Sequence, residues 1–305
     1  MVDADSKTIF HLLEKLRTNP TTTPEWNYFV NSTGLKLFYR SFKPTSRTIQ
    51  KIVIGCHGMA AEGDYFILYA DQFVEQTGSA FYVMDYRGHG RSEGSKGDIK
   101  DFQLLLDDLK EFTEFLQTVH ANTPIFVLGE SMGGVVSLNF ALQNPELLQG
   151  IVEFAPAVKV FMGSFSIKDI LKFIGGFTLY LFKPGMLLFA TKSNEAAIIR
   201  DETHQRFDFE NPYHLEAVSL RYIFQVNKFS KKAFKSGEEI KVPIIIFQGE
   251  DDKVVDPEGV SQYFETIKSE DKELVLVPES YHVLTTDPAF IDWGWDKLRD
   301  WLNSH

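Results

Sequence analysis

Two short motifs could each place a serine where it attacks an ester or an amide. Both have the form Gly-x-Ser-x-Gly, one around Ser92 and the other around Ser131. In this motif the serine occupies a sharp turn between a strand and a helix, which exposes its hydroxyl above a sheet. Ser131 has that context, because the apolar run 125–128 precedes it and a helical pattern over 132–143 follows. Ser92 lies in the polar loop 86–98, so Ser131 is the predicted nucleophile.

A serine hydroxyl becomes an effective nucleophile when a histidine takes its proton and a carboxylate orients that histidine. With this motif the order along the chain is serine, acid, histidine. Four histidines follow Ser131. His305 is the last residue, while His204 and His214 come before any later strand that could supply the acid. His282 follows the last predicted strand, and a loop at the carboxyl end of that strand can reach the serine. We therefore predict that His282 is the base.

The acid is expected in the loop after a strand pattern over 242–247. Hydrophobic periodicity does not separate the four carboxylates that crowd this loop, which are Glu250, Asp251, Asp252 and Asp256. Asp256 precedes a proline, a sequence typical of the first residues of a helix, so it is more easily explained as a helix cap. The residues alone leave the choice of acid open.

Acyl transfer also needs N–H donors for the oxyanion that forms on the attacked carbonyl group. One expected donor is the backbone amide that follows the serine, that of Met132. The second is expected from the loop after the first buried strand, where Gly58 lets the backbone approach and the Met59 amide is our candidate. His57 in this loop is predicted to brace it, and Cys56 to be a small core residue.

Apolar strand patterns alternate with helical patterns from residue 51 onward. The strand patterns cover 51–56, 80–85, 124–128, 150–154, 242–247 and 273–277. Several are apolar on both faces, as a parallel sheet covered by helices requires. Between them, 157–240 contains helical and loop patterns without a clear strand. We predict an α/β fold with three parts: an N-terminal helical extension at 1–25, a core formed by 26–156 (opening with a hairpin) and 241–305, and a helical cap at 157–240 inserted before the last two strands.

Composition excludes several classes of protein. The 305 residues include 31 basic and 42 acidic side chains, a formal net charge of −11, which argues against a nucleic acid partner. One cysteine permits no internal disulfide and no cysteine-built zinc site, as expected in a reducing compartment. The first residues lack a signal-peptide pattern, and no apolar run is long enough to span a bilayer. We therefore expect a cytoplasmic protein; the sequence predicts no oligomeric state.

Four stretches together resemble the α/β-hydrolase superfamily, in particular its monoacylglycerol lipase and lysophospholipase branch. They are 57–59 (His-Gly-Met), 85–94 (Asp-Tyr-Arg-Gly-His-Gly-Arg-Ser-Glu-Gly), 129–134 (Gly-Glu-Ser-Met-Gly-Gly) and 281–284 (Tyr-His-Val-Leu). The resemblance covers about residues 26–303. It implies a catalytic acid at the fourth position of a Gly-x-x-Asp turn, which is Asp252. One departure is Ala60, where the family often has the second glycine of His-Gly-x-Gly-Glu.

The cap has a composition that suits lipids. Residues 157–192 carry five lysines and one aspartate, a net charge of +4, and eleven of the 27 phenylalanines lie between 156 and 241. We expect this segment to form an acyl-chain wall, and the predicted substrate-binding residues are Phe161, Phe165, Ile170, Ile174 and Phe177. A basic and apolar segment can also lie on a membrane surface, so peripheral contact through the cap is a second expectation.

The predicted function is hydrolysis of monoacylglycerol-like lipid esters through an acyl-enzyme. The same machinery would serve a lysophospholipase, a thioesterase or a general carboxylesterase, and the sequence leaves these alternatives open. A non-catalytic binding protein with this fold is the alternative from a different class. No metal or organic cofactor is expected, because side chains, amides and water suffice for the chemistry.

Overall fold

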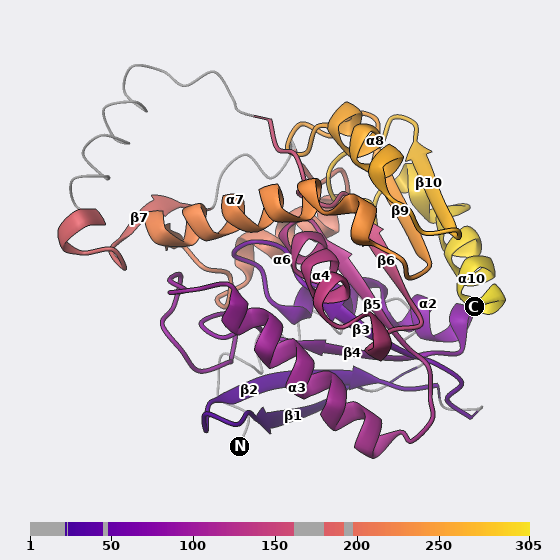
Figure 1. Ribbon diagram of the computed structural model, residues 1–305, viewed down its shortest axis with the longest axis horizontal. Helices are drawn as coiled ribbons and strands as arrows, with labels where there is room; N and C mark the ends of the chain where they lie inside the picture. The colour runs from indigo at the N-terminus through magenta and orange to yellow at the C-terminus, as the bar shows by residue number, and fades with distance from the viewer. Residues whose placement is uncertain (1–21, 23, 45–47, 162–179, 192–197) are drawn as a thin grey trace.

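An eight-stranded sheet forms the centre of the molecule (Figure 1). The computed structural model describes residues 22, 24–44, 48–161, 180–191 and 198–305. The strands are β1 (Glu25–Val30), β2 (Lys36–Phe42), β3 (Ile52–Cys56), β4 (Ala80–Met84), β5 (Ile125–Glu130), β6 (Gly150–Phe154), β9 (Ile244–Gly249) and β10 (Lys272–Val277). Their order across the sheet is β1-β2-β4-β3-β5-β6-β9-β10.

Strand direction brings several loops to one edge of this sheet. The pairs β1–β2 and β2–β4 are antiparallel, whereas β4, β3, β5, β6, β9 and β10 run parallel to one another. The loops that follow β3, β5, β9 and β10 therefore leave from the same edge, as in other open α/β sheets that bind ligands at strand carboxyl ends. The predicted hairpin is confirmed as β1–β2, with the Asn31 side chain accepting the amides of Thr33 and Leu35 in its turn.

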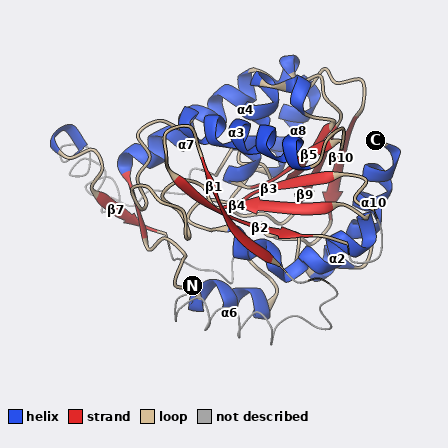
Figure 2. Cartoon of the chain, turned by 90° about the horizontal axis from the view of Figure 1, so that it is seen from below, coloured by secondary structure: helices blue, strands red, loops and turns tan. Residues whose placement is uncertain are grey.

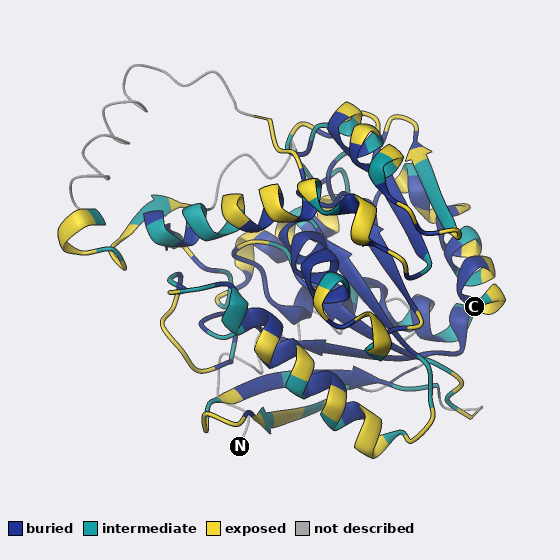
Figure 3. Cartoon of the chain, in the orientation of Figure 1, coloured by how far each residue is buried: buried dark blue, intermediate teal, exposed yellow. Residues whose placement is uncertain are grey.

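Helices cover both faces of the sheet (Figure 2). One face carries α3 (Gln103–Val119), α4 (Met132–Gln143), α7 (Leu220–Lys235) and α8 (Pro257–Thr266); the other carries α2 (Ile67–Thr77), α6 (Glu202–Glu210), α9 (Pro288–Ile291) and α10 (Gly294–Ser304). Alternate residues of β9 enter the two cores: Ile244 and Ile246 one, Ile245 and Phe247 the other. The inner strands are accordingly buried along their length (Figure 3), and the predicted fold class is confirmed.

The insertion between β6 and β9 differs from the expectation of helices and loops alone. It contains β7 (Leu187–Ala190) and β8 (Ala217–Ser219), which pair antiparallel in a separate small sheet. Both strands are too short to show a period of two in the sequence, so they were not predicted. Helix α7 packs on α4, where the Asn139 side chain donates to the Phe229 carbonyl at 3.1 Å. The helix predicted within 1–25 lies outside the described residues.

A fully buried arginine joins the sheet to the loops beside it. The Arg40 guanidinium on β2 contacts carboxylates of Glu62 (2.8 Å), Asp64 (2.7 Å) and Asp85 (2.5 Å), all fully buried. Glu62 also accepts from the Asn211 side chain of the insertion at 2.8 Å. Burial opposes the charged form of Asp85, but the attraction of Arg40 outweighs it and lowers the pKa of Asp85 to about 2. The cluster therefore fastens β2, the segment after β3 (which includes the short helix η1, Gly63–Phe66) and the insertion together.

Replacing Arg40 is expected to destabilise the protein severely. Arg40→Met removes the cation that contacts all three buried carboxylates and leaves them with Arg91, which pairs with Asp64 at 2.7 Å. The free energy of unfolding should therefore fall by about 3–5 kcal/mol. The matched control is Lys43→Met, which breaks a 2.6 Å pair between Lys43 and Glu25 in which both side chains are exposed. That change should cost less than about 1 kcal/mol. Denaturant titrations of both variants test this; equal losses would contradict it.

Candidate active site

Ser131 occupies a tight turn between β5 and α4. Its backbone has φ 58° and ψ −117°, a conformation that side-chain-bearing residues rarely adopt. The turn is held by hydrogen bonds from the Ser131 amide to the Phe154 carbonyl (3.0 Å) and from the Ala157 amide to the Ser131 carbonyl (2.9 Å). A Cβ atom on Gly133 would lie 1.8 Å from the Cys56 carbonyl oxygen, so only glycine fits where α4 begins.

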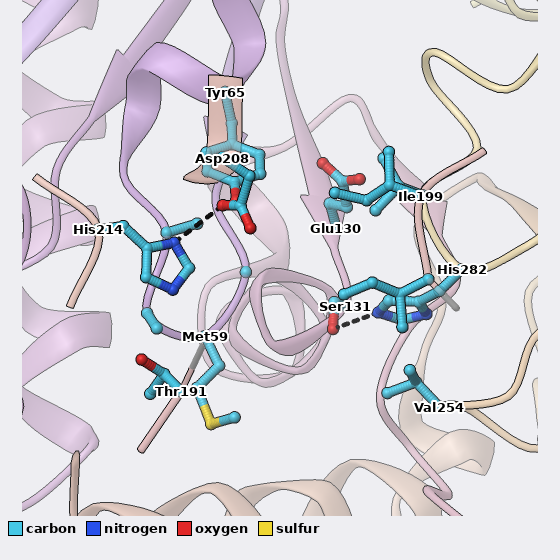
Figure 4. A pocket seen from close by; sticks show the side chains of 15 residues that line it. Met59, Tyr65, Glu130, Ser131, Thr191, Ile199, Asp208, His214, Val254 and His282 are labelled. Atoms are coloured by element: carbon cyan, nitrogen blue, oxygen red, sulfur yellow. Dashed lines mark hydrogen bonds and ion pairs between the residues drawn. The ribbon is translucent and has the colours of Figure 1, made fainter. Parts of the chain in front are cut away.

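His282 and Asp252 complete a hydrogen-bonded chain with the serine (Figure 4 draws its first link). The His282 Nε2 atom lies 2.9 Å from the Ser131 hydroxyl oxygen, and its Nδ1 atom lies 2.8 Å from Asp252 Oδ2. Asp252 follows β9 and His282 follows β10, so parallel pairing of these strands brings the two side chains together. The structure thus places the predicted nucleophile, acid and base in contact.

Backbone donors fix the Asp252 carboxylate. Its Oδ1 atom accepts the amides of Val254 (2.7 Å) and Val255 (3.0 Å). Burial opposes the charged form, but the attraction of His282 and these hydrogen bonds outweigh it, so the pKa of Asp252 is lowered. Among the other carboxylates of the loop, Asp256 caps α8 by accepting the Glu258 amide, as its sequence predicted, and Asp251 is exposed.

The charge of Asp252 also acts on the base. Burial disfavours the imidazolium form of His282, but the attraction and hydrogen bond of Asp252 outweigh it, and Glu130 adds to them. The pKa of His282 is consequently raised above its ordinary value. This is the behaviour expected of a histidine that has to hold a proton during a reaction.

His57 and Cys56 have structural environments, as predicted. The His57 Nε2 atom accepts the Tyr86 amide at 3.1 Å, and burial lowers the pKa of His57 to about 4. It therefore stays neutral and holds the loop after β4 to the loop after β3. Cys56 is fully buried, and burial raises the pKa of its thiol to about 12, so the reactive thiolate does not form at neutral pH.

Both candidate oxyanion donors belong to segments that lie beside the serine. Met132 is the first residue of α4, and amides in the first turn of a helix have no partner within the helix. A Cβ atom on Gly58 would lie 3.7 Å from the Ser131 Cβ, which puts the Met59 segment against the serine. Ala60, which stands where the resembling family has glycine, adopts φ 64°. Position 60 therefore has a left-handed backbone although its residue is alanine, at a cost of about 1–2 kcal/mol.

A cavity of about 230 Å³ opens beside Ser131 (Figure 4). Its lining residues are Gly58, Met59, Ala60, Ala61, Tyr65, Glu130, Ser131, Thr191, Ile198, Ile199, Asp208, His214, Val254, His282 and Val283. Most of its surface is apolar, but Glu130, Asp208 and His214 are polar and were not predicted to belong to the site. Glu130 could have been noticed, since it is the residue before the serine in the motif. Asp208 and His214 come from the insertion, which shows no usable pattern.

The predicted acyl-chain wall is not found at Phe161. That residue is half-exposed and absent from the cavity lining, because its amide pairs with the Val254 carbonyl at 2.9 Å and its side chain projects outward. The other four predicted residues, Phe165, Ile170, Ile174 and Phe177, lie outside the described residues. From the insertion, the structure instead brings Thr191, Ile198 and Ile199 to the cavity, with Asp208 and His214.

The sheet order and the serine turn after β5 define an α/β-hydrolase. Residues 47–289 match the family model described as serine aminopeptidase, S33, and the chain belongs to this family. Within the described ranges, no three His, Cys, Asp or Glu side chains are grouped to hold a metal ion. Nor does any helix in that part of the chain have the length and hydrophobicity to cross a membrane.

Similar proteins include several monoglyceride lipases. The chain is 27% identical over 294 residues to the monoglyceride lipase of Mus musculus, with 94% of each chain covered. The structure is similar to that of a soluble variant of monoglyceride lipase from Saccharomyces cerevisiae in complex with a substrate analog, with a TM-score of 0.82, 25% identity and coverage of 95% and 98%. The monoacylglycerol lipase of Paleococcus ferrophilus shares the fold, with a TM-score of 0.74, 23% identity and coverage of 88% and 99%.

Proposed function

We propose that the protein hydrolyses monoacylglycerol-like esters through an acyl-enzyme intermediate. The observation that carries this proposal is the chain of hydrogen bonds from Asp252 through His282 to Ser131, located at a mainly apolar cavity. The names of the similar proteins, monoglyceride lipases from mouse and yeast, favour a glycerol ester over other esters. A lysophospholipase would use the same three residues and would differ in the alcohol that leaves.

In the first half of the reaction, His282 Nε2 takes the proton of the Ser131 hydroxyl as its oxygen attacks the ester carbonyl carbon. The carbonyl oxygen becomes an oxyanion, which the Met59 and Met132 amides stabilise. The bond to the leaving alcohol then breaks, and His282 returns the proton to the leaving oxygen. Asp252 keeps His282 in the tautomer that accepts at Nε2. In the second half, a water molecule attacks the acyl-enzyme with His282 again acting as base.

Labelling with a fluorophosphonate tests the nucleophile. The wild-type protein should be labelled, and Ser131→Ala should abolish labelling because the attacking hydroxyl is gone. Ser92→Ala is the matched control from the second motif, and it should still be labelled. Ser92 has a structural role, since its hydroxyl donates to the Asp85 carbonyl (2.6 Å) and accepts the Phe38 amide (2.8 Å). An unlabelled wild type, or a labelled Ser131→Ala protein, would refute the proposal.

The raised pKa of His282 predicts the acid limb of activity. A protonated His282 has no free Nε2 lone pair for the serine proton, so kcat/KM should fall about tenfold per pH unit below its pKa. The midpoint of this limb should lie above the ordinary histidine value of about 6.5. Asp252→Asn should lower kcat by about 10⁴. Steady-state pH profiles with a p-nitrophenyl ester measure the acid midpoint of kcat/KM and the loss of kcat in Asp252→Asn. An acid midpoint below the ordinary pKa of histidine would contradict the prediction.

We further propose that the cap receives long acyl chains and contacts anionic lipid. Two side chains at the tip of the described cap, Leu181 and Phe182, are 63% and 81% exposed. The neighbouring Tyr180 ring packs against Phe224 of α7 at 5.4 Å. Helix α7 carries Arg221, Lys228, Lys231, Lys232 and Lys235 and no acidic residue. Exposed apolar side chains beside a basic helix suit a lipid interface.

A series of glycerol esters from two to sixteen carbons tests this cap proposal. We expect kcat/KM to rise with chain length to at least eight carbons, since each buried methylene contributes about 0.8 kcal/mol. Sedimentation with vesicles should show more binding to phosphatidylserine-containing than to pure phosphatidylcholine vesicles, and Phe182→Ser should weaken it. An optimum at two to four carbons together with no vesicle binding would eliminate the proposal.

A further inference from the structure

A buried carboxyl group beside the nucleophile takes no part in the mechanism above. Glu130 ends β5 and immediately precedes Ser131, and only 6% of its surface is exposed. Its carboxyl group points into the cavity, between Ile199 and the Tyr65–Asp208 side (Figure 4). Its Oε1 atom is buried and has no hydrogen-bond partner among the residues that the structure describes. Burying a carboxyl oxygen without a hydrogen-bond partner costs roughly several kcal/mol of folding free energy, so we expect a bound molecule to supply a partner here.

Further polar groups line the opposite side of the cavity (Figure 4). The Asp208 carboxylate lies 2.9 Å from Nδ1 of His214, and the Nε2 atom of His214 is buried without a partner among the described residues. The lining contains no lysine or arginine within those residues. Two carboxyl groups therefore face a confined space, and no lysine or arginine of its described lining offsets them.

The mechanism locates these polar groups relative to the ester. The leaving oxygen receives its proton from His282 Nε2, so the alcohol portion of the substrate has to lie on the His282 side of Ser131. Glu130 is close enough to His282 to favour its charged form. Glu130 thus adjoins the place of the alcohol, whereas the Asp208–His214 pair lies across the cavity, on the side of Ser131 away from His282 (Figure 4). The aliphatic side chains Ile198, Ile199, Val254 and Val283 form other walls.

We propose that Glu130 selects the leaving group: it accepts hydrogen bonds from an alcohol portion that carries hydroxyl groups or a positive charge, and it repels one that carries a phosphate. The inference rests on the proposed function, which it narrows to esters of neutral polyols and cationic alcohols. Rejection by like charge in a space shielded from water is an effective device for specificity. Lysophosphatidic acid would accordingly be a poor substrate, although it has the same acyl chain and glycerol backbone.

Three esters with one dodecanoyl chain provide the first test. They are dodecanoylglycerol, dodecanoylcholine and dodecanoylglycerol phosphate, assayed at pH 8 below their critical micelle concentrations. Burial raises the pKa of Glu130 to about 7, so the carboxyl group is ionised at this pH. For the wild-type protein we expect kcat/KM for the glycerol and choline esters to exceed that for the phosphate ester more than tenfold. A smaller preference for the glycerol ester overturns the inference.

Two isosteric variants test the residues. Glu130→Gln removes the negative charge beside the alcohol, and the preference for the glycerol ester over the phosphate ester should narrow fivefold or more. Asp208→Asn removes a charge across the cavity and should narrow this preference less. The measured quantity is the ratio of kcat/KM for the glycerol ester to kcat/KM for the phosphate ester, both determined on one preparation. A smaller fraction of folded protein lowers both values equally and leaves the ratio unchanged. Glu265→Gln on the exposed side of α8 is the control and should leave the ratio unchanged. The assignment is overturned if Glu130→Gln narrows the preference less than fivefold, or if Asp208→Asn or the control narrows it as much as Glu130→Gln does.

The leaving-group inference can fail while the proposed function stands. If the wild-type protein reacts with the fluorophosphonate and cleaves all three esters at similar rates, the leaving-group inference fails and the proposed function stands. If it neither reacts with the probe nor cleaves any ester, both fail together.

Discussion

The backbone of Ser131 is held in an unfavourable conformation by the close approach of three strands' ends, and the rest of the site follows from that approach. The amide of Ser131 binds the end of β6, and Gly133 packs against the carbonyl of Cys56 at the end of β3. Any side chain at position 133 would separate β3 from α4. The strain is offset by cores on both faces of the sheet, so a deformed turn is carried by a rigid support.

Parallel pairing explains why distant parts of the sequence meet at this turn. Asp252 and His282 follow neighbouring strands. The insertion enters between β6 and β9, and β6 lies between β5, which precedes the serine, and β9, which precedes the acid. The insertion is thus above the cavity by topology, and it can contribute Asp208 and His214 without moving Ser131. The Arg40 cluster adds a polar connection, because Glu62 binds both the sheet and Asn211.

The strand patterns and the motif around Ser131 were enough to predict the sheet and the positions of the serine and the histidine, because both signals are local. Asp252 needed the family resemblance, since one loop holds several carboxylates that differ only in their tertiary hydrogen bonds. Helix α2 was not predicted although Ile67, Ala70, Phe73 and Val74 form a buried apolar stripe at helical spacing. Strand β7 was not predicted because it is only four residues long. Glu130 has a local signal, but its orientation toward the cavity depends on the fold. The exposure of Phe161 likewise reflects a pairing with Val254 that no periodicity indicates.

The single cysteine of the chain has a practical consequence for biophysical work. Cys56 is fully buried and its thiol has a pKa of about 12, so it is inert toward alkylating reagents while the protein is folded. A cysteine introduced at an exposed cap position, for instance by Phe182→Cys, would then be the only thiol open to a fluorophore or spin label. With a second exposed cysteine introduced near the sheet, spectroscopic distances between the cap and the sheet can be measured without first replacing the native thiol, and the core that supports Ser131 stays as it is.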